Sequence, residues 1–596
     1  MDVMLILLAA GLLSWPLGRY MTAVFAGAPH WSDKVFLRPE LLMLRLFGVD
    51  GRAGMNWRQY GLAFVAANLL LGIIAYVLLL CQHLLPLNPD NVGPLSWDLA
   101  LHTAVSFLTN TNQQHYSGQL QLSFFSQSVV LVTLQFLTPA MGLALALAVL
   151  RGMTGGLNSA TAKAGEPRNL GNFYQDSLRA FTRVLLPLSV VLALLLGSQG
   201  VPSNYQAATE AVLLEAPQSA EQAHSQKIPQ GPVAAMVAIK QLGTNGGGWY
   251  GPNSTNPLEN PTPLSNALET IALVLVPMAM LWMMGGMLSR TASVNAAAAS
   301  QAGLTAQTGL TPRAGQGFAR MSFAVMAVLS LCFVAAAVYS EMQPNAAFAG
   351  LGASGGNLEG KEVRFGTDLS ALWSTLTTQT SNGSVNAMHD SLNPLAGLIS
   401  RAGMLINAIW GGIGCGLINF IVYIWLSVFI AGLMIGRTPE MFGRKLEKTE
   451  LSWLGLLLVL PSAVILILTA ITLSVPEWTA NSNPGLHGIS QVFYEYTSAF
   501  ANNGSGFEGL GDNTPWWNLS TVLALLLGRY LPLLIPLIIA GRLAQKQVTP
   551  PGAASLPLQS LTFGVTVVVV ILLLNFLSFL PSMVLGPIGE ALVDLR

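Results

Sequence analysis

Four short polar turns hold the residues whose types and spacing could bind an ion. Their cores read TNTNQ, GTNGGG, TSNGS and ANNGS. Each follows a helix-compatible stretch of about 10 to 15 residues, which is too short to cross a bilayer. Glycine tolerates positive φ and lets other atoms approach the main chain, so such turns serve as phosphate cradles, tight turns or carbonyl-lined ion sites.

The spacing of the turns indicates an internal repeat. Asn112, Asn245, Asn382 and Asn503, taken as equivalent positions, are separated by 133, 137 and 121 residues. A phosphate cradle is disfavoured because the chain lacks G-x-x-x-x-G-K-[ST] and any glycine-rich strand-to-helix turn of a soluble domain. A structural glycine turn remains open for any single copy, whereas four related copies favour one shared ion site.

The predicted ion is K⁺, as the transported ion, with no organic cofactor. Backbone carbonyls suit a monovalent cation, whereas Ca²⁺ and Mg²⁺ sites normally recruit carboxylates, and no Asp or Glu stands in the core of any turn. Most of the Asn side chains are expected to hold the turns by hydrogen bonds. The candidate potassium-binding residues are Thr111, Asn112, Gln113, Gln114, Thr244, Asn245, Gly246, Gly247, Ser381, Asn382, Gly383, Asn502, Asn503 and Gly504.

Membrane spans are the elements that must position these turns. The chain of 596 residues is 52% hydrophobic and only 9% charged, with 27 basic and 27 acidic residues. This composition predicts a polytopic membrane protein and provides no bulk charge that would attract nucleic acid. Runs long enough to cross about 30 Å of hydrocarbon predict ten spans. They lie near residues 2–26, 60–84, 127–150, 180–199, 264–288, 319–340, 395–435, 451–475, 517–541 and 561–590.

The predicted fold class is an all-α polytopic membrane protein with a fourfold repeat. Each repeat contains a span, a re-entrant helix, a filter turn and a second span, and the four turns meet on a pseudo-fourfold axis. One additional helix is expected at each end. The predicted boundaries are 1–59 for the N-terminal helix and loop, 60–151, 179–290, 319–437 and 451–543 for the repeats, and 560–596 for the C-terminal helix.

Basic residues predict the orientation in the membrane. Lys and Arg concentrate on the cytoplasmic side, and the loops after the first, third, fifth, seventh and ninth spans, taken with the adjoining ends of the spans, hold 20 of the 27 basic residues. Both termini are therefore expected on the extracytoplasmic side. The first apolar segment lacks a basic region before it and a convincing cleavage site, so it is expected to stay as a helix.

Four glycines interrupt the seventh span. They are Gly411, Gly412, Gly414 and Gly416, in the run WGGIGCGLINF. The interruption predicts a broken helix, since this apolar run is too long for one simple span. A flexible gate beneath the filter and plain helix packing are both open readings of these glycines.

Three charged residues deserve a functional or structural assignment. Arg529 lies in the middle of a span, where a charge is costly unless it faces a cavity or a partner, so a place on the ion path is the default hypothesis. A structural ion pair is the alternative, with Asp390 as the candidate partner, although Asp390 could also cap the following helix. Arg401 is expected to extend towards the membrane surface.

Histidines and cysteines give no sign of a further metal site. The six outer histidines are scattered along the sequence, and the three cysteines lie in or beside apolar segments, as small buried hydrophobes do. K⁺ is therefore the only metal ion expected. These residues are His83, His102, His115, His224, His389 and His487, with Cys81, Cys332 and Cys415.

Several long and uncommon stretches carry a resemblance to a known family. They include SWDLALHTAVSFLTNTN, GTNGGG, LENPTPLSNAL, LEGKEVRFG, AMHDSLNP, FIAGLMIGRTPE, NPGLHG and ANNGSGF. On these stretches, over its whole length, the chain resembles the KdpA family, the potassium-binding subunits of the Kdp potassium-transporting ATPases. One departure is Gln113, which stands where family members often have an aromatic residue, while Gln114 matches the family glutamine.

The resemblance implies partners and roles that the residues alone do not give. It implies one K⁺ filter made by four non-identical loops, and a bacterial or archaeal plasma membrane. The implied partners are a P-type ATPase catalytic subunit, a small single-span subunit and a very short accessory membrane subunit. It also implies that Arg529 lies on the route of the ion below the filter, where its charge would repel K⁺, and that the interrupted span is a gating loop.

The leading functional hypothesis is the ion-binding component of a primary pump. The chain has no nucleotide motif, no aspartyl-phosphate loop and no cytoplasmic segment large enough for a nucleotide-binding domain, so it is not expected to be an enzyme by itself. It would select K⁺ outside and pass it to an ATP-driven partner. The alternative is a stand-alone channel-like potassium transporter driven by membrane potential or ion gradients. A sodium-coupled solute carrier is disfavoured by the four pore turns.

Overall fold

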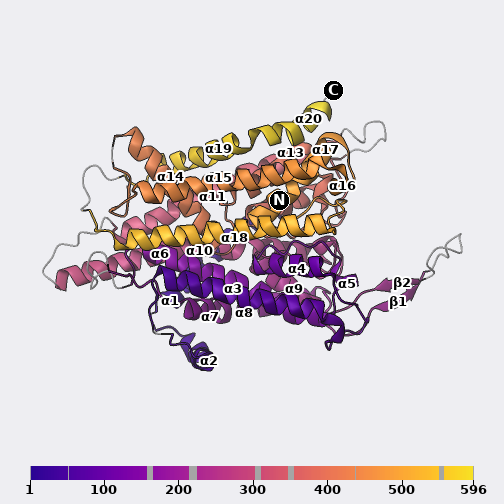
Figure 1. Ribbon diagram of the computed structural model, residues 1–596, viewed down its shortest axis with the longest axis horizontal. Coiled ribbons are helices and arrows are strands. Elements are labelled where there is room, and N and C mark those ends of the chain that lie inside the picture. The colour runs from indigo at the N-terminus through magenta and orange to yellow at the C-terminus, as the bar shows by residue number, and fades with distance from the viewer. Residues whose placement is uncertain are drawn as a thin grey trace.

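The computed structural model describes residues 2–27, 29–51, 53–157, 166–213, 225–301, 310–345, 355–436, 438–549 and 556–594. Within them, ten helical segments are long and apolar enough to cross a membrane, as predicted. These spans are α1 (Asp2–Phe25), α3 (Trp57–Leu80), α6 (Val132–Met153, after a π-helical turn at Ser126–Leu131), α7 with α8 (Phe173–Arg179 and Leu186–Ser198), α10 (Pro263–Gln301), α11 (Pro312–Glu341), α14 (Cys415–Met434), α15 (Lys448–Ser474), α18 (Pro515–Gln545) and α19 (Leu561–Met583). They run side by side along the long axis of the molecule (Figure 1).

Small residues let the central spans approach one another closely. A Cβ atom added at Gly152 of α6 would lie 2.8 Å from the Cβ atom of Ala540 in α18, and one at Gly285 of α10 would crowd Ala319 of α11. Lipid tails are as apolar as leucine, so helix association in a membrane depends on this kind of close packing. The tight packing fixes the frame that holds the turns.

Four shorter helices enter the bundle without crossing it. They are α4 (Trp97–Leu108), α9 (Val233–Leu242), α12 (Gly366–Gln379) and α17 (Gly485–Ala501). At 10 to 17 residues they are too short to span a bilayer. The predicted re-entrant helices are therefore confirmed as elements, and each ends at one of the four polar turns. In Figure 1, α4, α9 and α17 lie in the same half of the molecule as the hairpin β1–β2.

The seventh predicted span is broken, as expected. A helix α13 (Pro394–Ile406) and the span α14 are separated by residues 407–414. Asn407, Trp410, Gly411 and Gly414 all have positive φ there, which no helix can accommodate. The break therefore follows from backbone conformation, and residues 407–414 are called the break segment below.

The remaining elements lie at the ends and edges of the bundle. The short helices are α2 (Asp33–Leu46), α5 (Gly118–Gln121), α16 (Pro476–Thr479) and α20 (Gly589–Asp594). Strands β1 (Thr209–Val212) and β2 (Ser225–Ile228) form an antiparallel hairpin in which Thr209 pairs with Ile228. Strands β3 (Glu440–Met441) and β4 (Arg444–Lys445) form a second, shorter one. His224, one of the outer histidines of the sequence, lies outside the described residues.

Candidate functional site

The four turns share one backbone conformation. In each turn the first and third of four consecutive residues have positive φ. The N–H of the second residue donates to the carbonyl oxygen five residues earlier, at 2.9 to 3.1 Å. The first to fourth positions are Asn110, Thr111, Asn112 and Gln113 in turn 1, Thr244 to Gly247 in turn 2, Ser381 to Ser384 in turn 3, and Asn502 to Ser505 in turn 4. The common pattern defines four equivalent loops.

This equivalence corrects the register expected for turn 1. Thr111, and not Asn112, occupies the position of Asn245, because its N–H bonds to Ser106 as that of Asn245 bonds to Lys240. The sequence TNTN offers two Asn residues, and matching by side-chain type selected the wrong one. Asn110, in the first position, was missed altogether. The two positive φ angles that define the turn, at Asn110 and Asn112, belong to the backbone and have no fixed residue type.

Three turns touch the next turn through a glycine. A Cβ atom at Gly246, Gly383 or Gly504, each in the third position, would overlap the second-position carbonyl oxygen of the following turn. These oxygens belong to Asn382, Asn503 and Thr111, respectively. The order runs from turn 2 to turn 3, to turn 4 and back to turn 1, so the contacts follow a ring.

The fourth junction, between turns 1 and 2, is made by side chains. Asn112 stands in the third position of turn 1, and a Cβ atom at Gly247 would lie 2.7 Å from the Cβ atom of Asn112. Gln114 donates to the carbonyl of Gly248 at 3.0 Å and accepts from the Gly248 N–H at 2.9 Å. The pair Gln114 and Gly248 thus closes the ring at the one junction where the third position is not a glycine.

The second-position carbonyls differ from most of the fourth-position carbonyls in hydrogen bonding. Within the described part of the chain, no donor bonds to the backbone oxygen of Thr111, Asn245, Asn382 or Asn503, although all four residues are at least 97% buried. Three of the four fourth-position carbonyls are paired instead: those of Gln113, Gly247 and Ser384 accept from Ser106 Oγ, Gln135 Nε2 and Trp373 Nε1, at 2.8, 3.0 and 2.8 Å. Buried backbone carbonyls are rarely left unpaired, so four at equivalent positions call for a ligand.

Asn side chains hold the turns together, as expected. Asn382 Nδ2 donates to the carbonyl of Lys240 at 3.0 Å, and Asn503 Nδ2 donates to that of Thr377 at 2.8 Å. Each therefore bonds to the C-terminal part of the re-entrant helix that leads into the preceding turn, which is α9 for Asn382 and α12 for Asn503. Their Oδ1 atoms accept from the N–H groups of Ser384 and Ser505 at 2.9 and 3.1 Å. Every such bridge ties two neighbouring turns and fixes the width of the ring.

The break segment packs against the inner ends of the turns. Ile413 N donates to Thr244 Oγ1 at 3.0 Å, and Ser381 Oγ donates to Asn407 Oδ1 at 2.7 Å. Asn407 in turn donates to the carbonyl of Ala501, the last residue of α17, at 3.1 Å. The segment therefore bonds turns 2 and 3 and the end of α17 at once.

The four candidate gate glycines have steric reasons to be glycine. Gly411 and Gly416 lie directly against one another, and Gly414 lies against the backbone of Gly142 in α6. A Cβ atom at Gly412 would lie 2.8 Å from Cys415 Sγ. These contacts show the packing role that the sequence left open as one of two readings.

Arg529 is buried beneath the turns and next to the break segment. Arg529 is 2% exposed, and its Nη2 atom lies 3.4 Å from the carbonyl oxygen of Thr138. A Cβ atom at Gly142 would lie 3.3 Å from this Nη2 atom and 2.6 Å from the carbonyl oxygen of Ile413. The Nη1 atom has no hydrogen-bond partner among the described residues. The charge thus sits between α6, α18 and the break segment.

Asp390 is not the partner of Arg529, so that expectation is wrong. Asp390 accepts from His487 Nε2 at 2.8 Å and from Gln491 Nε2 at 3.1 Å, near the start of α17. The sequence placed Asp390 after the third turn but gave no distance to α18. The side chain bonds instead to residues in the N-terminal part of α17, and its charge is matched there by His487.

Arg401 does not extend to the surface, which corrects a second expectation. Its residue is 1% exposed, and the guanidinium carbon lies 4.8 Å from the ring centre of Phe507 and 5.8 Å from that of Tyr494. A guanidinium over aromatic faces keeps a favourable electrostatic contact without water. The two rings come from α17 and the segment after it, which the sequence could not bring next to α13.

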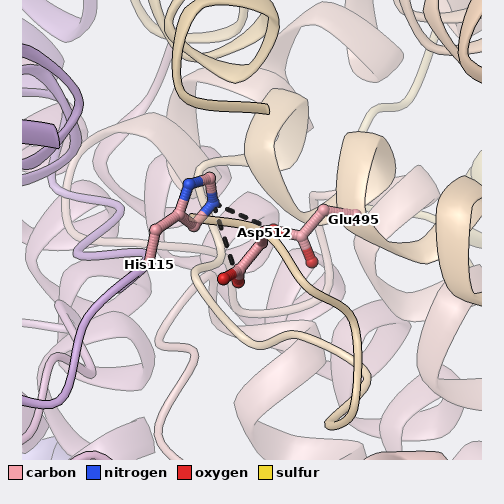
Figure 2. Close-up of side chains that lie close together, drawn as sticks. All are labelled: His115, Glu495 and Asp512. Carbon is pink, nitrogen blue, oxygen red and sulfur yellow. Dashed lines mark hydrogen bonds and ion pairs between the residues drawn. The ribbon is translucent and has the colours of Figure 1, made fainter. Parts of the chain in front are cut away.

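Two of the outer histidines are neighbours, although they are scattered in the sequence. The rings of His102 and His115 stack with centroids 3.7 Å apart. His115 also faces two carboxylates, Glu495 of α17 and Asp512 of the segment before α18, as Figure 2 shows. The cluster lies beside turn 1, because Gln113 donates to Glu495. The sequence contained no spacing signal for it, since residues from two repeats contribute.

Known proteins resemble this chain over almost its entire length. Residues 4–592 match the sequence profile of KdpA, described as the potassium-transporting ATPase A subunit. A potassium-transporting ATPase potassium-binding subunit from Gloeobacter violaceus is 44% identical over 584 residues, which are 97% of this chain and 95% of that protein. The corresponding subunit from Staphylococcus haemolyticus is 40% identical over all of both chains. Among solved structures, the potassium transporter TrkH from Vibrio parahaemolyticus aligns with a TM-score of 0.49 and 12% identity, covering 90% of this chain and 97% of that one.

Proposed function

Because this chain belongs to the KdpA family of potassium-transporting ATPase A subunits, we propose that its four turns form the K⁺ selectivity filter of such a pump. The chain binds K⁺ from the extracytoplasmic side and delivers it through the membrane to an ATP-hydrolysing partner subunit. The observation that carries the proposal is the set of four buried, donor-free carbonyls of Thr111, Asn245, Asn382 and Asn503.

The unpaired carbonyls explain why an ion would bind. An unsatisfied buried carbonyl raises the free energy of the folded protein by about 1 to 3 kcal/mol. A bound K⁺ removes this cost, because the carbonyl oxygens replace the hydration shell of the ion, as they do in carbonyl-lined selectivity filters. The filter residues are those of the candidate set, to which Asn110 is added. In turn 1 the carbonyl of Gln113 is already paired, so Thr111 contributes the equivalent ligand.

The ring contacts explain how the filter keeps its size. The third-position glycines let neighbouring turns approach main chain to main chain, and the Asn382 and Asn503 bridges prevent them from separating. Both effects hold the oxygens at fixed separations before the ion arrives. Preorganisation of this kind raises affinity because little ordering remains to be done on binding.

Below the filter, Arg529 and the break segment would direct the ion. A buried guanidinium repels K⁺ moving straight inward, since charges in a low-dielectric environment interact strongly. A cavity adjoins the break segment and is lined in part by Asn407, Asn419, Gly528 and Asn575. This cavity offers polar groups to an ion that turns aside from Arg529. A sideways route to the partner chain is therefore part of the proposal, with Gly411, Gly412, Gly414 and Gly416 forming the gate.

The energy would come from other subunits. The proposed partners are a P-type ATPase catalytic subunit, a small single-span subunit and a very short accessory subunit. The repeats at 60–151, 179–290, 319–437 and 451–543 would form the pore, flanked by 1–59 and 560–596. Arg437, at the end of the third repeat, lies outside the described residues. Both termini would be extracytoplasmic, with the protein in a bacterial or archaeal plasma membrane.

Purification of the chain alone and in its complex tests the proposal. The expected result is K⁺-stimulated ATP hydrolysis by the complex that is absent when this chain is omitted. Robust K⁺ flux through the chain alone, in vesicles without an ATPase partner, would support the channel-like transporter instead. Both measurements use the same reconstituted membranes, so the two outcomes are directly comparable.

A further inference from the structure

We propose that His115, Glu495 and Asp512 form a binding site for a divalent transition cation of the zinc class, beside turns 1 and 4. The site is separate from the four-carbonyl filter and takes a different kind of ion. Its three side chains come from two repeats and converge on one point (Figure 2).

The distances are close to those of a metal site. His115 Nε2 lies 3.4 Å from Glu495 Oε1 and 3.9 Å from Asp512 Oδ2, and all three ligand atoms lie within 4.8 Å of one another. In a tetrahedral zinc site with bonds of about 2.0 to 2.2 Å, ligand atoms are about 3.3 to 3.6 Å apart. Asp512 is the ligand that would move inward. It lies in the segment between α17 and α18, and its side chain is 28% exposed, which also leaves a path for the ion.

The hydrogen bonds of His115 leave the correct nitrogen free. His115 Nδ1 lies 2.7 Å from Asn518 Oδ1, while Asn518 Nδ2 donates to Asp98 Oδ2 at 3.0 Å. This orientation of the Asn518 amide requires Nδ1 of His115 to carry the proton and to donate. When the ring carries no second proton, the lone pair of Nε2 is directed towards the two carboxylates. Metal-bound histidines are oriented by just such an outer hydrogen bond.

The two carboxylates that face His115 need positive charge close to them. Glu495 is 2% exposed at its side chain, and the ion pairs of Glu495 and Asp512 within the described residues are with His115 alone. Buried carboxylates without a counter-charge are strongly destabilised. A proton on His115 would supply one positive charge against two negative charges. A divalent ion balances both, and one imidazole with two carboxylates favours Zn²⁺ and its neighbours over Ca²⁺ or Mg²⁺.

Gln113 provides a second, independent sign of a ligand. Its Nε2 atom donates to Glu495 Oε1, as expected for the outer shell of a metal-bound carboxylate. Gln113 is 2% exposed, and the oxygen of the same amide, Oε1, is buried. This oxygen has no hydrogen-bond partner among the described residues. Because both atoms belong to one amide, Oε1 lies beside the cluster. It can therefore complete the coordination, directly or through a bound water.

Occupation of the site would reach the filter, a consequence that rests on the proposed function. Gln113 is the fourth position of turn 1, and a Cβ atom at Gly506, the residue directly after turn 4, would lie 3.2 Å from Glu495 Oε2. A bound cation would therefore link the segments that follow turns 1 and 4. It would also neutralise the negative charges of Glu495 and Asp512 beside the proposed filter. External Zn²⁺ is expected to reduce K⁺ uptake.

Metal counting on the intact complex tests the site without using transport. The complex is stripped of metal, equilibrated with Zn²⁺ in excess Mg²⁺, separated from free ion and analysed for zinc by mass spectrometry. Wild type is expected to retain one Zn²⁺ more than Asp512→Asn or His115→Gln, and each substitution is expected to weaken zinc binding at least tenfold. His83→Gln is the matched control, because His83 is an exposed outer histidine that is not one of the three proposed ligands.

Two outcomes would overturn the site. Equal zinc content and affinity in the wild type, both variants and the control would place any bound zinc elsewhere in the complex. No zinc above background in the wild type would show that the site binds no metal, and that a proton on His115 supplies the only positive charge facing Glu495 and Asp512. Gel filtration and subunit content verify that each variant assembles. K⁺-stimulated ATP hydrolysis in zinc-free buffer tests the proposed function separately, so the two failures can be told apart.

Discussion

Gly246 lies against the backbone carbonyl of Asn382, so closely that a methyl group on Gly246 would overlap that oxygen. The contact joins turn 2 to turn 3 through main-chain atoms alone. Gly246 also has a φ of 76°, which L-residues other than glycine rarely adopt. Two independent constraints therefore exclude a side chain at this position.

Gly246→Ala is predicted to abolish high-affinity K⁺ uptake. The added methyl group must displace Asn382, whose carbonyl is a proposed ligand, and widen the ring. Uptake would be measured in cells that depend on this system at low external K⁺. Gly455→Ala is the matched control, since a Cβ atom there meets no atom of the described residues within 4 Å. Normal uptake by an assembled Gly246→Ala complex would contradict the role assigned to turn 2.

Asn503→Ala is predicted to weaken K⁺ binding while leaving the fold intact. It removes the hydrogen bond to Thr377 and the one from the Ser505 N–H, which together hold turn 4 against turn 3. Two such bonds contribute about 1 to 3 kcal/mol, or about five- to 150-fold in the K⁺ concentration for half-maximal ATP hydrolysis. The measurement is that concentration in the purified complex. An unchanged value would show that the Asn side chain does not set the ring.

Much of the fold could be predicted from local sequence, because membrane spans and re-entrant helices are defined by the length of apolar runs. Breaks at Gly411 and Gly414 were visible for the same reason. Contacts between repeats were not predictable. The register of Thr111, the burial of Arg401 among aromatic rings and the cluster around His115 depend on segments far apart in the chain. The Asn side chain at position 112 suggested that Asn112 is equivalent to Asn245. Backbone angles define the turn, and they make Thr111 the equivalent residue.

Arg529→Gln is predicted to uncouple K⁺ movement from ATP hydrolysis. Glutamine has a similar length but no charge, so the barrier to K⁺ moving straight inward falls. Reconstituted vesicles containing the complex should then show K⁺ leakage in the absence of ATP. Arg529→Lys keeps the charge and is expected to remain tight. Equal leakage from both variants would mean that packing around Arg529 matters and its charge does not.

Stability is predicted to depend on pH through His487, which links Asp390 to Glu590 of α20 at 2.8 and 2.7 Å. Burial disfavours the imidazolium, but the hydrogen bonds and charges of the two carboxylates outweigh it and raise the pKa of His487 to about 9. Because the folded-state pKa is raised, the stabilisation is complete below the ordinary value of 6.5 and is lost as the pH rises to about 9.

Thermal unfolding of the wild type and His487→Gln checks this dependence. Glutamine keeps a hydrogen-bond donor but has no charge, so the variant should be less stable at pH 6 and equal to the wild type near pH 10. His83→Gln should follow the wild type throughout. A stability difference that does not change between pH 6 and pH 10 would show that the charge of His487 has no part in docking α20.

Anomalous X-ray scattering from Rb⁺, a substitute for K⁺, tests the central claim most directly. Crystals of the complex grown in Rb⁺ should show one peak within the ring, coordinated by the backbone oxygens of Thr111, Asn245, Asn382 and Asn503. Oxygen distances of about 2.8 to 3.0 Å are expected for an ion that has exchanged its hydration shell for carbonyls. Ordered turns with no Rb⁺ peak between them, or a peak held only by side chains elsewhere, would contradict the account.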